Sequence, residues 1–190
     1  RILANISQRL SEGEILQIEN SINKNMSEDI YFKMISDKTA SLISASCKLG
    51  YISTSNDEKK INIEKFGEYL GVAYQLKDDL FDVLGKLKDT GKPSQLDLKK
   101  NMLTLPYIHI LKKVSSKKRK RIISNLKYYS RKSNLTEIEN LISDLGGIKF
   151  TEEKIKEFSS KAYDEVNHFD DSKYKDLLIK TIEFNIDRKF

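Results

Sequence analysis

The sequence has few residues that cross-link a chain or break a helix: one Cys and two Pro among 190 residues. The single thiol, Cys47, excludes an internal disulfide framework, and without a CxxC pair a cysteine-rich zinc site is excluded as well. The apolar stretches are too short or too interrupted to cross a bilayer. Leu, Ile, Lys, Glu and Ser dominate what remains. We therefore expect residues 1–190 to form a single all-α domain.

A covalent catalyst is also missing from the sequence. His109 and His168 lie far apart, and neither stands in an HExxH motif or beside a Ser or Cys nucleophile. Cys47 follows a run of small residues, which predicts a packed thiol. The net charge of +6 fits an acidic partner, such as nucleic acid, an anionic membrane or a phosphorylated small molecule. Charge does not choose among these partners.

Apolar residues at three- and four-residue steps predict a series of helices. Ser27 is expected to cap a helix that ends near Gly50, and Asn62 to cap one that runs to Leu84. Thr104 is expected to cap a third, and residues 85–98 are expected to be irregular. Other helices are predicted at residues 1–25, 117–131, 135–145, 151–168 and 173–190.

The centre of the predicted organisation is an acidic cluster, Asp78, Asp79 and Asp82, with Gln75 one turn upstream. Two carboxylates about 5.5 Å apart repel by roughly 3 kcal/mol at an effective dielectric near 20. Mg²⁺ would offset this repulsion, because it binds carboxylate oxygens together with the oxygens of a substrate phosphate. The alternative is a solvent-facing cluster relieved by neighbouring lysines.

The most basic stretch is Lys112–Arg121, KKVSSKKRKR. A solvated connection between two helices is the simpler interpretation. The alternative is a patch that binds nucleic acid or a membrane. No aromatic residues interleave these charges, although single-strand binding usually needs them.

Several motifs occur in an order that resembles the trans-polyprenyl diphosphate synthases, and in particular the bacterial octaprenyl-type enzymes. The segment YQLKDDLFD, with Gln75, Asp78, Asp79 and Asp82, resembles the second aspartate-rich motif of that family. Lys38, Thr39 and Ala40 match its KTA motif. Gly91 and Lys92, the SEGEILQ segment ending at Gln17, Leu103–Pro106 and Gly146-Gly147 match further family segments.

The resemblance implies an isoprenoid synthase-type helical bundle, of which this chain is the C-terminal half. It implies that the aspartates bind Mg²⁺ and that Lys38, Thr39, Gln75, Lys92 and Gln17 bind or act on substrate. The implied reaction ionises an allylic diphosphate and joins its cation to isopentenyl diphosphate, giving a polyprenyl diphosphate. It further implies a cytoplasmic homodimer that binds no nucleic acid and delivers its product to a membrane.

The chain departs from the family pattern in three ways. No first aspartate-rich motif precedes Arg1, Gln95 replaces a usual Gly, and Met102 replaces a usual Lys. We therefore expect the chain alone to be inactive. Two alternatives stay open: a non-catalytic helical subunit that regulates a partner prenyl synthase, and a basic helical module that binds nucleic acid through Lys112–Arg121.

Overall fold

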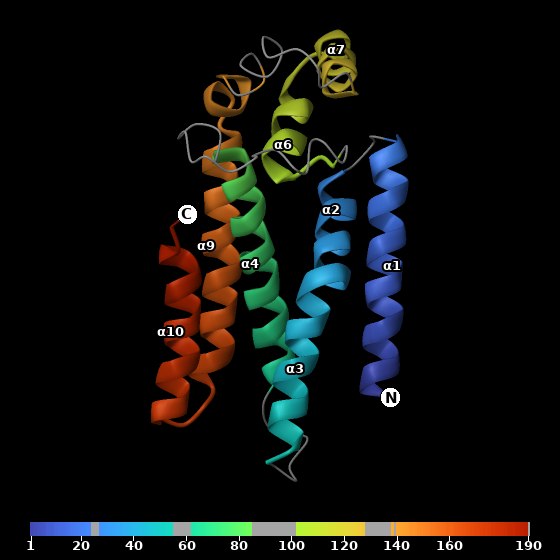
Figure 1. The fold of residues 1–190 in the computed structure, drawn as a ribbon. Helices are drawn as coiled ribbons and strands as arrows, with labels where there is room; N and C mark the ends of the chain where they lie inside the picture. Colours follow the sequence, from blue (N-terminus) through green and yellow to red (C-terminus); the bar gives the residue numbers. More distant parts are fainter. Residues whose placement is uncertain (24–26, 55–61, 85–101, 128–137, 139, 190) are drawn as a thin grey trace.

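The computed structural model describes residues 1–23, 27–54, 62–84, 102–127, 138 and 140–189. Every regular element in these ranges is helical (Figure 1), which confirms the predicted all-α class. The elements are α1 (Ile2–Asn23), α2 (Glu28–Ile35), the π-helical turn η1 (Ser36–Ala40), α3 (Ser41–Ile52), α4 (Ile63–Leu84), α6 (Leu105–Lys113), α7 (Ser116–Lys127), α9 (Gly147–Asn167) and α10 (Lys173–Asp187). None of these helices is both long and apolar enough to span a membrane.

Helix α4 is the central element of the bundle. It packs most extensively against α9 on one side and α3 on the other, and α10 lies beyond α9 (Figure 1). One core cluster, with Leu76 and Leu80 of α4, extends to α2, α6 and α9. A second, with Phe66 and Leu70, packs against α9 and α10. The acidic segment is thus on a helix that is buried along much of its length, as apolar positions at helical spacing predict.

The predicted helix from Ser27 to Gly50 is only partly correct. Ser27 is the N-cap, and its hydroxyl accepts a hydrogen bond from the Ile30 backbone N–H. The turn η1 then divides the predicted helix into α2 and α3. Helix α3 ends near Gly50, as predicted, but Gly50 lies inside it and the helix continues to Ile52, because Gly50 does not take the left-handed conformation that ends a helix. The prediction of Gly50 as a terminator was wrong.

Helix α6 starts after Thr104, at the position predicted for its cap, with Pro106 in the first turn. The Thr104 hydroxyl makes no capping hydrogen bond. Helix α9 begins at Gly147, four residues before the predicted Thr151, because Gly146 takes a left-handed conformation (φ 75°) and lets the chain turn directly into the helix. Residues 138 and 140–144 are also helical, within the predicted 135–145 helix. The predicted irregular segment 85–98 lies outside the described residues.

Two glycines let neighbouring helices approach the π-helical turn. A Cβ on Gly13 of α1 would lie 2.8 Å from the backbone nitrogen of Lys38, and a Cβ on Gly71 of α4 would lie 2.5 Å from the Cα atom of Ala40. Both contacts are with backbone that cannot swing away. The turn is therefore packed between α1 and α4.

Gly71→Ala should lower the free energy of unfolding by about 1–3 kcal/mol, because the new methyl group overpacks the contact with Ala40. Gly50→Ala is the matched control: its Cβ meets nothing within 4 Å, so higher helix propensity should stabilise the chain by up to about 1 kcal/mol. Urea denaturation of both variants measures the difference. Equal stability of the two variants would contradict the tight packing of η1 against α4.

Candidate functional site

The π-helical turn η1 distinguishes this part of the chain from an ordinary helix. The backbone N–H of Ser41 donates to the Ser36 carbonyl five residues earlier. The Ser41 hydroxyl donates to the Asp37 carbonyl at 2.6 Å, which satisfies an acceptor within the widened turn. Such turns are rare and often occur at functional sites. This turn contains Lys38 and Thr39, two of the residues predicted to bind substrate.

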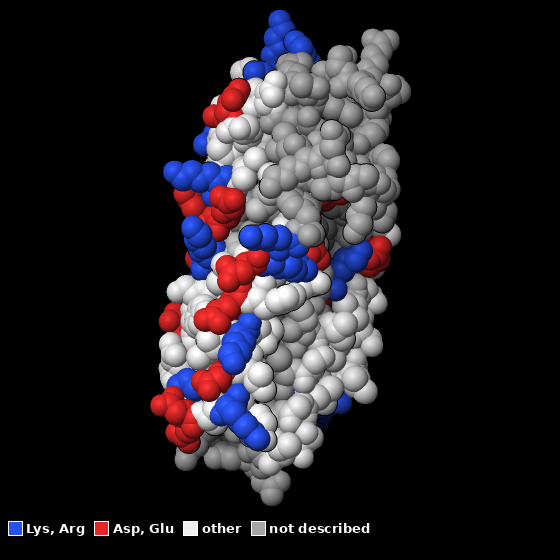
Figure 2. All heavy atoms as spheres, turned by 60° about the vertical axis from the view of Figure 1, so that its left-hand side comes forward, with Lys and Arg blue, Asp and Glu red and all other residues white. Residues whose placement is uncertain are grey.

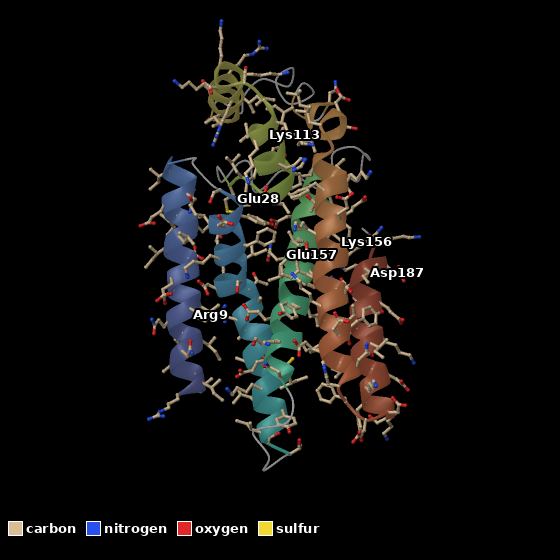
Figure 3. All side chains as sticks on the ribbon, turned by 180° about the vertical axis from the view of Figure 1, so that it is seen from behind. Arg9, Glu28, Lys113, Lys156, Glu157 and Asp187 are labelled. Carbon is tan, nitrogen blue, oxygen red and sulfur yellow. The ribbon has the colours of Figure 1, made fainter. Side chains whose placement is uncertain are left out.

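Arg9 of α1 holds the turn in place. Its guanidinium donates to Asp37 (Nε to Oδ1, 2.8 Å), to the Ser36 hydroxyl (2.9 Å) and to Glu68 of α4 (Nη2 to Oε1, 2.8 Å). Ser36 also hydrogen-bonds to Glu68, and Lys33 donates to the other oxygen of Asp37 at 2.6 Å. Figure 3 shows Arg9 midway along α1. The planar fork of one arginine thus joins α1, η1 and α4.

The charges in this network support one another. Burial alone would raise the pKa of Asp37, but the hydrogen bonds from Lys33 and Arg9 outweigh burial, and the pKa lies below its usual value of 3.8. The hydrogen bond with Glu68 is the largest contribution that raises the pKa of Arg9. Asp37 is therefore a carboxylate that stays ionised in a nearly closed environment.

On the other side of the turn lies a cavity of about 220 Å³. Lys38 donates from Nζ to Gln17 Oε1 at 2.7 Å and forms an ion pair with Glu14 at 2.6 Å. Met34, Ile35 and Leu103 provide apolar wall. The structure thus brings Lys38 and Gln17, two predicted site residues, together at one cavity.

A chain of hydrogen bonds along the wall of the same cavity connects η1 to α4. Thr39 donates from its hydroxyl to Gln75 Oε1 at 2.8 Å, and Gln75 donates from Nε2 to Asp79 Oδ1 at 2.7 Å. The Tyr31 hydroxyl donates to Asp79 Oδ2 at 2.5 Å. Asp79 is buried, with 4% of its surface exposed. Thr39, Gln75 and Asp79 thus form one fixed polar wall. The role of Tyr31, which holds the Asp79 carboxylate, was not predicted from the sequence.

The three aspartates do not share one environment. Asp79 lines the cavity, whereas Asp78 points toward the C-terminal end of the chain and accepts a hydrogen bond from Arg188. The Arg188 guanidinium also lies over the ring of Tyr74, 4.3 Å from its centroid. Asp82, one turn after Asp78, is half-buried and does not line the cavity. Lys92 lies outside the described residues.

No group of three or more His, Cys, Asp or Glu side chains positioned to hold a metal occurs in the part of the chain that the structure describes. This does not argue against Mg²⁺, which usually takes one or two carboxylates and completes its shell with water and phosphate oxygens. The cavity offers a carboxylate, Asp79, beside donors suited to phosphate oxygens. The donor chemistry therefore fits a Mg²⁺ ion that arrives with a phosphorylated ligand.

One buried hydroxyl in this cavity has no hydrogen-bond partner among the described residues. Thr104 is 3% exposed and lines the cavity, and its Oγ1 atom bonds to no group within the described ranges. The sequence predicted Thr104 as a helix cap and as part of the Leu103–Pro106 family segment, but not as a residue of the site. Thr104 therefore adds an unpartnered polar atom to the lining of the cavity.

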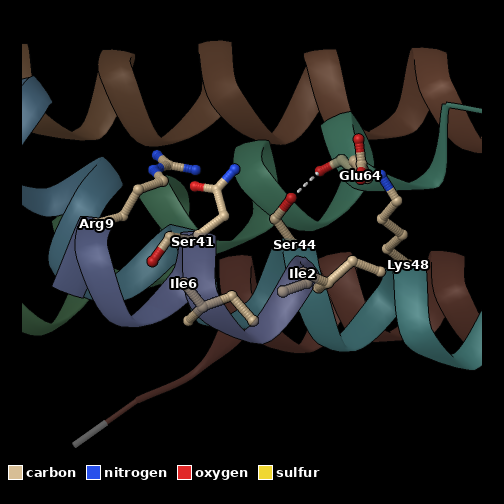
Figure 4. A pocket seen from close by; sticks show the side chains of 9 residues that line it. Ile2, Ile6, Arg9, Ser41, Ser44, Lys48 and Glu64 are labelled. Carbon is tan, nitrogen blue, oxygen red and sulfur yellow. Dashed lines mark hydrogen bonds and ion pairs between the residues drawn. The ribbon is translucent and has the colours of Figure 1, made fainter.

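A second cavity, of about 150 Å³, lies between α1, α3 and α4 (Figure 4). Three of its polar side chains are already paired: the Ser44 hydroxyl donates to the Glu64 carbonyl at 2.8 Å, and Lys48 forms an ion pair with Glu64. Arg9, on its wall, is already committed to Asp37 and Glu68. This second cavity is therefore a weaker candidate for a ligand site than the first cavity.

The remaining reactive side chains are structural, as the sequence predicts. His109 stacks on Phe150 with ring centroids 4.1 Å apart, and burial lowers its pKa. His168 is the C-cap of α9. Burial raises the pKa of the Cys47 thiol, which packs against the second core cluster. None of the three lines the cavity.

Residues 1–145 match the family model described as polyprenyl synthetase. The chain belongs to the polyprenyl synthetase family. It is 26% identical over 190 residues to the octaprenyl diphosphate synthase of Haemophilus influenzae, a match that covers 100% of this chain and 58% of that protein. The resemblance stated from the motifs is confirmed.

Solved structures agree on the fold. A decaprenyl diphosphate synthase from Rhodobacter capsulatus superposes with a TM-score of 0.89 at 28% identity, covering 97% of this chain and 57% of that one. A polyprenyl synthase from Caulobacter crescentus, solved with calcium and isoprenyl diphosphate, gives a TM-score of 0.85 at 26% identity, with 98% and 58% covered. The chain therefore spans a little over half the length of these relatives.

The Arg9 network predicts a specific dependence of stability on pH. Because the pKa of Asp37 in the folded protein lies below the ordinary value of 3.8, its contribution to stability is complete above that pH and is lost as the pH falls through the folded pKa. Asp37→Asn should be less stable than the wild type at pH 7, and the difference should shrink below about pH 4. Thermal unfolding between pH 2.5 and 7 measures it.

Asp164→Asn, an exposed site on α9, is the matched control and should follow the wild-type curve. A constant difference between Asp37→Asn and wild type across this range would contradict the charged network.

Proposed function

We propose that residues 1–190 are part of a single helical domain of a Mg²⁺-dependent prenyltransferase. The reaction would condense isopentenyl diphosphate with an allylic diphosphate to give a polyprenyl diphosphate. The observation that carries the proposal is the cavity itself: a lysine, two threonine hydroxyls, a fixed amide and a buried carboxylate surround one space. Family membership supports the same reaction class.

The side chains suit a diphosphate as leaving group. The carbon–oxygen bond of the allylic substrate would break with its electron pair leaving on the diphosphate. The allylic carbon would then bond to isopentenyl diphosphate, and the new carbocation would give a proton to the departed diphosphate, which restores a double bond. Lys38 would stabilise the charge that grows on the departing oxygen, since an ammonium beside it acts more strongly in a site sheltered from water.

The neighbours of Lys38 would orient it. Glu14 and Gln17 hold its ammonium group at the cavity, so that little rearrangement is needed when phosphate oxygens arrive. The Thr39 hydroxyl would turn from Gln75 to the diphosphate, and the Thr104 hydroxyl, which lines the same cavity, would donate to it as well. Met34 and Ile35 line the same space and would exclude water from the cationic carbon.

Asp79 would hold Mg²⁺ from the cavity wall, with Asp78 and Asp82 of the same helix segment as further carboxylates. The ion would supply positive charge against the diphosphate. Tyr31 and Gln75 would fix the Asp79 carboxylate, since each donates to one of its oxygens. Arg188 pairs with Asp78, so recruitment of Asp78 would require that contact to open.

The activity is tested with protein expressed from its complete reading frame, supplied with Mg²⁺, radiolabelled isopentenyl diphosphate and a short allylic primer. Asp78→Ala should lower turnover by orders of magnitude and leave helical content unchanged. Near-normal turnover would remove Asp78 from the metal site. Absence of any condensation by the wild-type protein would overturn the proposed function.

Lys38→Ala should weaken binding of the allylic diphosphate about 10- to 100-fold, because it removes a charge-assisted hydrogen bond. Lys48→Ala is the control, because Lys48 has a similar exposure and also pairs with a glutamate, but lies outside the cavity. Calorimetric titration compares them. Equal affinity of the two variants would exclude Lys38 from the diphosphate site.

Thr104→Val tests the unpartnered hydroxyl. The change should leave stability unchanged or raise it, because it removes a buried polar group without a partner. It should also weaken binding of pyrophosphate with Mg²⁺ about tenfold, and Thr104→Ser, which keeps the hydroxyl, should retain most of the affinity. Thermal unfolding and calorimetry together separate the two effects. Full affinity in the valine variant would show that Thr104 does not contact the ligand.

A further inference from the structure

Positive charge is concentrated in one segment of the sequence. Residues 98–136 contain twelve of the 34 basic residues and none of the 28 acidic ones, so the remaining residues together carry a net charge of −6 although the whole chain carries +6. In the described part of this segment the basic residues belong to α6 and α7. Basic and acidic residues are therefore distributed unevenly along the sequence.

Helix α7 presents these charges outward. Lys117, Lys118, Lys120 and Arg121 are exposed, whereas Ile122 is 3% exposed and belongs to the core. Ile123 packs against the same core cluster. The helix therefore uses its apolar side to join the domain and leaves its cationic side on the surface. Several of its long side chains that end in nitrogen extend away from the bundle (Figure 3).

The face that α9 and α10 present shows the usual pattern instead. Acidic and basic side chains are interspersed there (Figure 2), and Glu157 accepts from both Lys154 and Lys161 at 2.6 Å. Helices α6 and α7 contain no acidic residue of their own. Lys112 reaches Glu28 of α2 at 2.9 Å, which ties the base of the cationic segment to the bundle. A surface shaped only for solubility would mix both signs.

The cationic helix is at the same end of the bundle as the candidate site. Met102, Leu103 and Thr104 line the cavity, and α6 begins at the next residue. Helix α6 then leads to α7, which lies beyond it at that end (Figure 1). A flat anionic surface in contact with α7 would therefore face the end of the bundle that holds the cavity.

We propose that the cationic face of α7 docks the protein on an anionic lipid surface. The choice of a membrane rests on the proposed function, since a polyprenyl chain is insoluble in water and partitions into a bilayer. The contact would be electrostatic, because the apolar side of α7 is already buried in the domain. Nucleic acid fits less well, because the run from Lys112 to Arg121 has no aromatic side chain on which bases could stack.

Binding to vesicles tests this proposal without any enzyme assay. The wild-type protein is mixed with vesicles of phosphatidylcholine alone, or with 30% phosphatidylglycerol, and the bound fraction is measured by flotation at several salt concentrations. Binding should require the anionic lipid. It should also be lost toward 1 M salt, where the screening length falls to about 3 Å.

Two triple variants isolate the surface. Lys117→Gln, Lys118→Gln and Lys120→Gln together remove three charges from α7, and Lys65→Gln, Lys156→Gln and Lys180→Gln remove three from exposed sites elsewhere. Both variants have the same net charge. Each cation near an anionic surface strengthens binding about fivefold, so the α7 variant should bind about 100-fold more weakly. The control variant should bind as the wild type does.

Equal binding by the two variants, or equal binding of wild type to neutral vesicles, would overturn the proposal. Tighter binding to duplex DNA than to anionic vesicles at 150 mM salt, lost only in the α7 variant, would overturn it in favour of nucleic acid. Because vesicle binding needs no substrate, failure of the condensation assay would leave this result intact. Circular dichroism of both variants confirms that they fold.

Discussion

The structure around the site depends on one arginine that bonds to three partners at once. Arg9 bonds to Asp37, Ser36 and Glu68, so that α1, the π-helical turn and α4 are fixed by a single planar group. Two carboxylates and a hydroxyl satisfy its donors, as a partly buried guanidinium requires. The close approach of Gly71 to Ala40 holds the same turn by shape. Charge and packing therefore specify the same local geometry.

This constraint has a chemical consequence. Asp37 faces the network while its neighbours Lys38 and Thr39 face the cavity, so the turn separates structural charge from the groups available to a ligand. Lys38 is held by Glu14 and Gln17, and Thr39 by Gln75. Lys38 is thus preorganised at the cavity, whereas Thr39 would have to release Gln75 before donating to a ligand. The acidic residue that lines the cavity, Asp79, is fixed by two donors before any cation binds.

Helical periodicity and family motifs were enough to predict the all-α fold, the position of α4 and the meeting of Lys38, Thr39, Gln17 and Gln75. The π-helical turn was not predicted, because the one-residue shift it introduces falls in residues 36–41, where Ala40 is the one apolar residue that could show it. The partners of Arg9 lie 28 and 59 residues away in sequence, and Arg188 lies 110 residues from Asp78. Periodicity carries no information on such pairs. It also treats the three aspartates as equivalent, although their surroundings differ through contacts with α2 and the C-terminal residues.

The most direct test of the site is an amide ¹H–¹⁵N spectrum of the protein titrated with pyrophosphate in the presence of MgCl₂. We expect the largest shifts to fall on Lys38, Thr39 and Gln75 and to saturate together, and we expect none of them when pyrophosphate or Mg²⁺ is omitted. Shifts confined to α7 and other exposed basic segments, or unchanged amides in the π-helical turn, would contradict this prediction.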